Sequence, residues 1–133
     1  MAAVTDNNAQ EALVRQETDP PDDGWDDARG RLTWRTLFSA DRTPTGALVT
    51  GVAEIPTGGF LALHRHEQPE TYYVLSGTGT VTLDGREHPV RAGTTVFVPG
   101  DAEHGVRNDA DETLQFFYAL AADRFTDVRY RFS

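Results

Sequence analysis

The sequence contains no cysteine and no lysine, and it has only three serines. Without cysteine the protein has no disulfide, no thiolate metal ligand and no thiol nucleophile. Because all 12 basic residues are arginine, a lysine Schiff base, a lysine-held pyridoxal cofactor and a P-loop lysine are also excluded. None of the serines follows the nucleophile-elbow pattern. Any catalysis must therefore come from His, Glu, Asp, Tyr, Arg or a bound metal.

The chain also lacks an apolar run long enough to span a membrane, and its N-terminus lacks the basic and apolar regions of an export signal. We therefore expect cytoplasmic residence and no membrane partner. A length of 133 residues, 38% of them hydrophobic and 25% charged, is typical of a single soluble domain.

Positive charge is scarce as well, since the formal net charge is −9. This argues against nucleic acid as a partner, because nucleic acids bind to basic surfaces. The first 30 residues hold eight acidic residues against two arginines, a net charge of −6. We predict an acidic, flexible leader over residues 1–28, in which Asp6 as N-cap also allows a short helix over 7–17, and a β-barrel domain over residues 29–133.

The remaining sequence consists of short β-branched and aromatic runs separated by Gly, Pro, Asn and Asp. The expected strands are 32–38, 47–55, 60–66, 72–75, 80–83, 86–90, 94–98, 104–107 and 114–120, followed by a last strand or a strand-like tail over 124–132. Asp84-Gly85 is the strongest hairpin signal. This pattern predicts an all-β sandwich or barrel.

The segment His64-Arg65-His66 is the first candidate for chemistry. Successive side chains in a strand point to opposite faces, so both imidazoles project from one face and Arg65 from the other. A carboxylate, Glu70, follows four residues after His66. Two imidazoles and a carboxylate are natural ligands for a metal.

Two spaced motifs across residues 47–121 resemble those of the cupin superfamily, whose members are small double-stranded β-helix (jelly-roll) barrels. The first motif consists of Gly58, His64, His66, Glu70 and Gly77. The second motif consists of Gly93, Pro99, His104 and Asn108. The sequence departs from the second motif at Asp101, where a glycine is expected, which puts the conformation of that turn in question.

The resemblance implies that His64, His66, Glu70 and His104 are metal ligands. Three imidazoles and one carboxylate suit one divalent transition metal (Fe, Mn, Ni, Co or Zn), and they suit calcium poorly because it prefers six or more oxygens. His88 lacks such neighbours in the sequence, so we expect it to be an exposed strand residue.

A narrower resemblance extends beyond these motifs, to the small cupin lyases that cleave dimethylsulfoniopropionate. It is carried by Trp34 and by the segments 53–55, 63–66, 70–72, 102–104 and 123–130. It implies that the metal holds the substrate carboxylate while a tyrosine removes the proton next to it, so that dimethyl sulfide leaves and acrylate forms. The two tyrosines implicated in that family correspond to Tyr72 and Tyr130.

The chemistry of these tyrosines is plausible, because a nearby divalent cation lowers the phenol pKa from its ordinary value near 10. Tyr72 shares strand parity with Glu70, but it can equally be a core residue, and Tyr130 can equally pack the C-terminal tail. Strand alternation sends Phe116 and Tyr118 to one face, where they serve as core or surround a sulfonium by cation–π contact.

Other functions remain open at this level. The chain can be another single-cupin enzyme, such as an iron dioxygenase, a sugar isomerase or a polyketide cyclase, or a non-catalytic cupin that binds a metal or small molecule. If the chain is an enzyme, we expect a small-molecule substrate, and if it is a lyase, we expect that substrate to be a carboxylate. Exposed strand edges in so short a barrel also lead us to expect a homodimer.

Overall fold

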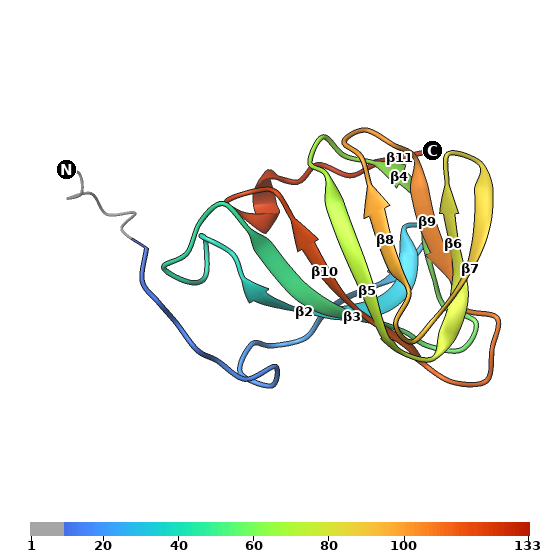
Figure 1. Ribbon diagram of the computed structural model, residues 1–133, viewed down its shortest axis with the longest axis horizontal. Coiled ribbons are helices and arrows are strands. Elements are labelled where there is room, and N and C mark those ends of the chain that lie inside the picture. Colours follow the sequence, from blue (N-terminus) through green and yellow to red (C-terminus); the bar gives the residue numbers. More distant parts are fainter. Residues whose placement is uncertain (1–9) are drawn as a thin grey trace.

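The computed structural model describes residues 10–133, and most of this range is β-strand (Figure 1). Its eleven strands are β1 Asp23–Asp27, β2 Gly30–Phe38, β3 Val49–Ile55, β4 Phe60–Arg65, β5 Glu70–Ser76, β6 Thr78–Leu83, β7 Arg86–Arg91, β8 Thr95–Val98, β9 His104–Arg107, β10 Leu114–Leu120 and β11 Arg131–Phe132. They form one curled antiparallel sheet in the order β7-β6-β9-β4-β2-β3-β10-β5-β8, with β1 on β2 and β11 on β4. The predicted all-β jelly-roll barrel is confirmed. Among the described residues, no helix has the length and hydrophobicity needed to cross a membrane.

Strand β10 shows how the sequence pattern builds the interior of this barrel. Its side chains alternate strictly between buried and half-buried, so that Leu114, Phe116, Tyr118 and Leu120 all face inward. An apolar residue at every second position removes one face of the strand from water. The predicted orientation of Phe116 and Tyr118 toward one face is confirmed.

The hairpin between β6 and β7 also follows the prediction. Asp84 and Gly85 both have positive φ, at 46° and 83°, and Leu83 pairs directly with Arg86. Two consecutive positive φ angles are the signature of a type I′ turn, whose twist matches that of the two strands it joins. His88 lies exposed on β7, as expected.

Strand β1 begins at Asp23, inside the segment predicted as a leader, and its five residues pair with β2 from Gly30 to Trp34. The apolar side chain that gives this acidic strand an inner face is Trp25, whose ring lies 5.1 Å from that of Trp34. Residues 10–17 form no helix, and the start of the predicted helix lies outside the described residues.

The C-terminal segment, predicted as a last strand or a strand-like tail over 124–132, is mostly not a strand. It forms a 3₁₀ helix at Phe125–Asp127 and only a two-residue strand, β11, against β4. The reason is a side-chain contact distant in sequence, because the Phe125 N–H donates to Ser39 Oγ at 2.9 Å. That contact turns the chain inward instead of letting it continue along a neighbouring strand.

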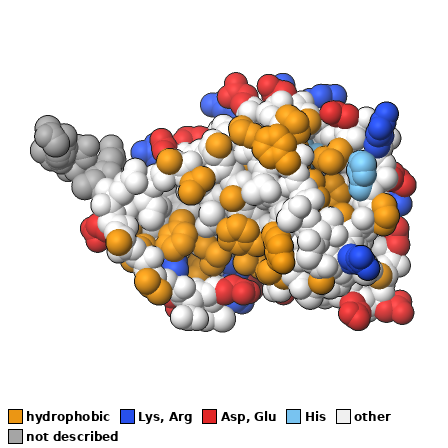
Figure 2. Space-filling view, viewed as in Figure 1, with side chains coloured by type: hydrophobic (Ala, Val, Ile, Leu, Met, Phe, Trp, Pro, Cys, Tyr) orange, Lys and Arg blue, Asp and Glu red, His pale blue; other side chains and the backbone are white. Residues whose placement is uncertain are grey.

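The outer face of β5 and β8 carries apolar side chains. Tyr73, Leu75 and Phe97 are all exposed, Phe97 by 65%. Figure 2 shows apolar side chains among the charged ones on this side of the molecule. In the described part of the chain, β8 pairs with β5 alone, so its other edge has no strand partner.

Candidate metal centre

The two histidines of the first motif point into the barrel. His64 lies near the end of β4 and His66 follows that strand, and their side chains are 0% and 1% exposed. Arg65, between them, is exposed and donates to the Asp101 carbonyl at 2.9 Å. The predicted split, with the two imidazoles on one face and the guanidinium on the other, is confirmed.

The sheet register brings the third histidine to the same place. His104 begins β9 and pairs directly with His64 of β4, and their ring centroids lie 4.1 Å apart. His104 is fully buried. The coordinating atoms of His64, His66 and His104 all lie within 4.8 Å of one another, a spacing suited to three ligands of one ion.

Hydrogen bonds fix which nitrogen of each ring faces the barrel interior. The Nδ1 atoms of His64, His66 and His104 lie 2.7, 2.9 and 2.9 Å from the carbonyl oxygens of Ala62, Gln68 and Ala102. A carbonyl only accepts, so each Nδ1 carries the proton and each Nε2 presents a lone pair. His64 Nε2 and His104 Nε2 are buried with no hydrogen-bond partner. This tautomer is the one that a metal-binding histidine adopts.

Glu70, the first residue of β5, completes this group, which we call the histidine end. Its Oε1 lies 3.2 Å from His66 Nε2 and 3.4 Å from His104 Nε2, and its side chain is 5% exposed. A positive charge between this carboxylate and the ring nitrogens, whether a proton or a bound cation, stabilises the group. The donor set and its buried lone pairs therefore fit a divalent transition metal.

Burial governs the charges at the histidine end. Desolvation, reinforced by the nearby His104, lowers the pKa of His64 to about 3. Desolvation acts to raise the pKa of Glu70, but contacts with His104 and His66 outweigh it, so this pKa lies below its ordinary value. His64 is thus neutral and Glu70 ionised at neutral pH, which are the states that bind a cation.

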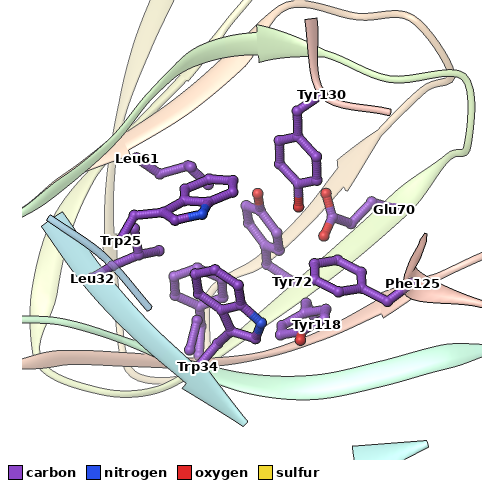
Figure 3. A pocket seen from close by; sticks show the side chains of 11 residues that line it. Trp25, Leu32, Trp34, Leu61, Glu70, Tyr72, Tyr118, Phe125 and Tyr130 are labelled. Carbon is purple, nitrogen blue, oxygen red and sulfur yellow. The ribbon is translucent and has the colours of Figure 1, made fainter. Parts of the chain in front are cut away.

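The two predicted tyrosines lie beside this end. The Tyr130 ring stacks on His64 at 4.7 Å between centroids, whereas Tyr72, on β5, has its ring 6.5 Å from His104. In Figure 3 the hydroxyls of Tyr72 and Tyr130 and the Glu70 carboxylate point toward one another. Desolvation and the Glu70 charge raise the pKa of both tyrosines well above the ordinary value.

A pocket of about 30 Å³ opens beside these groups (Figure 3). Its wall consists mostly of aromatic rings and includes Trp25, Trp34, Phe116, Tyr118 and Phe125. A volume of this size holds about two water molecules, so a ligand of several heavy atoms enters only if the wall moves.

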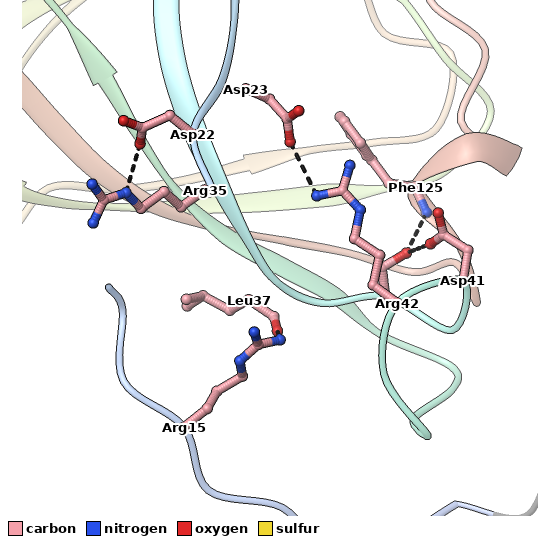
Figure 4. A network of polar contacts seen from close by, with 9 residues as sticks. Arg15, Asp22, Asp23, Arg35, Leu37, Asp41, Arg42 and Phe125 are labelled. Carbon is pink, nitrogen blue, oxygen red and sulfur yellow. Dashed lines mark hydrogen bonds and ion pairs between the residues drawn. The ribbon is translucent and has the colours of Figure 1, made fainter. Parts of the chain in front are cut away.

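Two of these wall residues were missed by sequence analysis. Trp25 lies in the stretch predicted as leader, where its single aromatic ring among acidic residues was the only signal. Phe125 comes from the tail and is placed by the bond from its N–H to Ser39 Oγ, which also contacts the Asp41 carboxylate (Figure 4). A 3.1 Å ion pair from Arg42 to Asp23 ties the same loop to β1.

Comparison with known proteins agrees with this geometry. The Cupin domain family matches residues 51–120, which span the histidine end and more than half of the chain. The chain belongs to the cupin family. This cupin is 41% identical over 120 residues to the dimethylsulfoniopropionate lyase DddW of Ruegeria pomeroyi, a match that covers 90% of this chain and 78% of DddW.

Solved structures show the same fold. The polyketide cyclase RemF from Streptomyces resistomycificus superposes with a TM-score of 0.78 at 22% identity, covering 92% of this cupin and 85% of RemF. The dimethylsulfoniopropionate lyase DddQ from Ruegeria pomeroyi gives a TM-score of 0.63 at 23% identity, covering 70% of this cupin and 48% of DddQ. At such identities the likeness extends to the barrel alone.

The turn that departs from the second cupin motif is also explained. Asp101 has φ of 65°, the left-handed region in which the family glycine is expected and which aspartate tolerates better than most residues. Its N–H donates to the His66 carbonyl at 2.8 Å. Asn108, the last residue of that motif, is structural, because its side chain bonds the Ile55 and Glu112 carbonyls at 2.9 and 2.7 Å.

Proposed function

We propose that this cupin is a metal-dependent carbon–sulfur lyase that cleaves dimethylsulfoniopropionate to dimethyl sulfide and acrylate. One observation carries the proposal: three buried histidines lie next to Glu70, and Glu70, Tyr72 and Tyr130 line one end of an aromatic pocket, where their polar groups point toward one another. The 41% identity with a lyase of this substrate supports it. His64, His66, Glu70 and His104 are the proposed ligands.

The bound divalent cation would supply positive charge that holds the substrate carboxylate and favours the ionised form of a nearby tyrosine. The tyrosine oxygen, of either Tyr72 or Tyr130, takes the proton from the carbon next to the carboxylate. The electron pair of that C–H bond forms the carbon–carbon double bond as the C–S bond breaks, and the C–S pair leaves on sulfur. The tyrosine then returns its proton to water.

The pKa directions explain why these residues need a cation. Burial, with the negative charge of Glu70, raises the pKa of both tyrosines above 10, so neither is a base near pH 7 on its own. A metal-free preparation should therefore lack both the ionised tyrosine base and the cation that holds the substrate carboxylate. Activity should rise with pH, because the base acts in its deprotonated form.

The pocket wall suits the other end of the substrate. A sulfonium is a cation with apolar methyl groups, and such groups bind against the faces of aromatic rings. Trp25 and Trp34 meet edge to face at 5.1 Å, and Trp34 and Phe125 at 6.1 Å, so rings surround this space from β1, β2 and the tail.

The direct test is to load the purified chain with Fe, Mn, Ni, Co or Zn and to measure dimethyl sulfide and acrylate together. We expect equimolar release with at least one metal and none after chelation. Failure with all five metals would overturn the proposal. Oxygen uptake with an aromatic substrate by the iron form would then favour a dioxygenase, and metal binding without any turnover would favour a binding protein.

We also propose that two copies pair through the β8 edge and the adjoining exposed side chains Tyr73, Leu75 and Phe97. An unpaired antiparallel edge can extend the sheet with its own copy, which covers apolar surface on both. Light scattering should give twice the mass of the 133-residue chain, and Phe97→Arg should halve it, whereas a monomeric wild-type protein would refute the pairing. Cytoplasmic residence remains a prediction, which fractionation of producing cells would test.

A further inference from the structure

The pocket has a second polar region, whose polar atoms take no part in the proton transfer or the bond cleavage proposed above. In residues 10–133, six buried side-chain polar atoms lack a hydrogen-bond partner. Two of them are the Nε2 atoms of His64 and His104. Three others, Trp34 Nε1, Thr36 Oγ1 and Tyr118 Oη, belong to β2 and β10, the two strands that flank β3, and we call these three residues the far end.

The sheet register explains how the far end forms. Thr36 of β2 and Tyr118 of β10 are both direct neighbours of Gly51 on the strand between them, β3. A side chain at Gly51 would meet the Tyr118 hydroxyl, so the missing Cβ is what lets the tyrosine ring extend across β3 toward β2. Trp34 lies two residues before Thr36 on β2, on the same face.

Two of these residues, Trp34 and Tyr118, line the pocket that also contains Glu70 and Tyr72. The Phe125 ring lies 6.1 Å from Trp34, 6.5 Å from Tyr118 and 6.3 Å from Tyr130. In Figure 3 the indole nitrogen and the Tyr118 hydroxyl lie on the side of Phe125 away from Glu70. The two polar regions are therefore opposite ends of one aromatic pocket.

The chemistry of the far end favours an acceptor. The Trp34 indole N–H can only donate, and the hydroxyls of Thr36 and Tyr118, which interact with each other, hold two protons, of which a bond between them uses only one. Thr36 and Tyr118 are buried, at 1% and 5% exposure, and Trp34 is half-buried with its Nε1 atom out of contact with water; a buried donor without a partner is costly. A neutral oxygen, placed between Trp34 and Tyr118, would satisfy this need, whereas a dimethylsulfonium group offers no acceptor.

We propose that Trp34 Nε1 and Tyr118 Oη form a hydrogen-bonding subsite for an oxygen atom at the end of the ligand remote from its carboxylate. The inference rests on the proposed function, in which the histidine end takes the carboxylate. It widens the substrate class of the pocket to short carboxylates that carry a carbonyl, hydroxyl or similar oxygen at the far end.

Unreactive ligands test the subsite without any turnover. Calorimetry on the metal-loaded chain compares pentanoate with 4-oxopentanoate and hexanoate with 5-oxohexanoate, pairs that differ by one carbonyl. For at least one pair we expect the oxo acid to bind about five- to tenfold more tightly, the effect of one or two buried hydrogen bonds. Tyr118→Phe and Trp34→Phe should each reduce that preference to below about twofold, where the preference is the ratio of the two affinities in the same variant, so that any change in binding of the plain acid cancels.

Tyr73→Phe is the matched control, because it removes a hydroxyl from the outer face of the neighbouring strand β5 and should keep the preference. Equal affinity for oxo and plain acids in the wild type overturns the subsite, as does a preference that survives both Tyr118→Phe and Trp34→Phe. A loss of thermal stability in Tyr118→Phe with an unchanged preference would show that the hydroxyl bonds Thr36 and has only a structural role. Binding of pentanoate itself tests whether the histidine end takes a carboxylate. Failure of the proposed function would therefore appear as loss of pentanoate binding, whereas failure of the subsite would appear only as loss of the preference.

Discussion

The two ends of the pocket differ in how their polar atoms are partnered. At the histidine end each Nδ1 donates to a backbone carbonyl, the Nε2 atoms of His64 and His104 have no hydrogen-bond partner, and that of His66 faces the Glu70 carboxylate. At the far end the N–H of Trp34 has no partner, and the hydroxyls of Thr36 and Tyr118 have at most each other. One end therefore presents lone pairs and a carboxylate to a cation, and the other presents donors to a neutral acceptor.

This difference shows what each end contributes to recognition. The histidine end is charged and rigid, because backbone bonds hold its rings, so it should fix where the carboxylate lies. The far end is neutral and bounded by aromatic rings from β1 and the tail, so it should select the other end of the ligand. Substitutions at one end should leave the function of the other intact.

The largest effect is expected from removing a ring at the histidine end. His104→Ala should lose the bound metal and lower dimethyl sulfide release by more than about 10⁴-fold, because the ion and the ionised base are lost together. Elemental analysis and the release assay measure the two effects. His88→Gln changes an exposed histidine and should affect neither, and Tyr118→Phe should retain a full equivalent of metal. Full metal content in His104→Ala would contradict the assignment of the ligands.

The next largest effect concerns the base. Tyr72→Phe and Tyr130→Phe should each keep the metal, and the variant that lacks the base should lose about 10²–10⁴ in kcat. Tyr73→Phe, on the outer face of the same strand as Tyr72, is the control. If both variants turn over at the wild-type rate, tyrosine is not the base and the resemblance to the lyases loses its chemical support.

Acid should reduce the stability of the fold through groups at the histidine end and not through groups at the far end. In metal-free protein the pKa of His64 is lowered to about 3 from an ordinary value of 6.5, so between these values the unfolded chain binds a proton that the folded chain does not. The contribution of His64 to the free energy of unfolding is therefore fully present above about pH 6.5. It falls as the pH drops toward 3, by up to about 1.4 kcal/mol per pH unit. The lowered pKa of Glu70 acts in the same direction.

Chemical denaturation at a series of pH values measures this slope. His64→Gln should flatten it, and Tyr118→Phe should leave it unchanged, because no far-end residue titrates in this range. The same slope in His64→Gln as in the wild type would show that other groups cause the acid sensitivity.

A smaller effect is expected at Gly51, beneath the far end. Gly51→Ala places a methyl group against the Tyr118 hydroxyl and 2.6 Å from the Arg35 carbonyl, so it should cost about 1–3 kcal/mol of unfolding free energy. Metal content should not change. Gly85→Ala is the comparison variant, because an added Cβ there meets nothing within 4 Å and only its φ of 83° is unfavourable. A cost no larger than that of Gly85→Ala would mean that Tyr118 moves freely.

The same contrast explains what the sequence could predict. His64, His66 and Glu70 lie within seven residues and share strand parity, so their convergence follows from local geometry, and His104 was found through the spacing of a second motif. The far end leaves no such pattern. Trp34, Gly51 and Tyr118 lie on three strands whose register is set by the closed sheet, and a missing Cβ at Gly51 has no meaning until Tyr118 lies across it.

Strand β1 and the C-terminal tail, which supply Trp25 and Phe125 to the pocket wall, were predicted least well for a related reason. Strand β1 has an acidic sequence with one inward aromatic, Trp25, so composition alone favours a solvated leader. The tail has strand-like residues over 124–132, but the bond from Phe125 to Ser39 Oγ, 86 residues away in sequence, overrides that preference. The local sequence pattern cannot predict side-chain contacts between residues so far apart in the chain.

The smallest effect is expected at Asp101, the position of the second cupin motif at which the family has glycine. A left-handed φ of 65° favours glycine by about 1 kcal/mol, but Asp101→Gly also removes an exposed ion pair with Arg131, which is worth about 0–1 kcal/mol. The two changes oppose each other, so the unfolding free energy should shift by less than about 0.5 kcal/mol. The backbone bond from residue 101 to the His66 carbonyl is kept, so metal affinity should be unchanged. A clear loss of metal in Asp101→Gly would mean that the carboxylate, and not the turn, holds His66 in place.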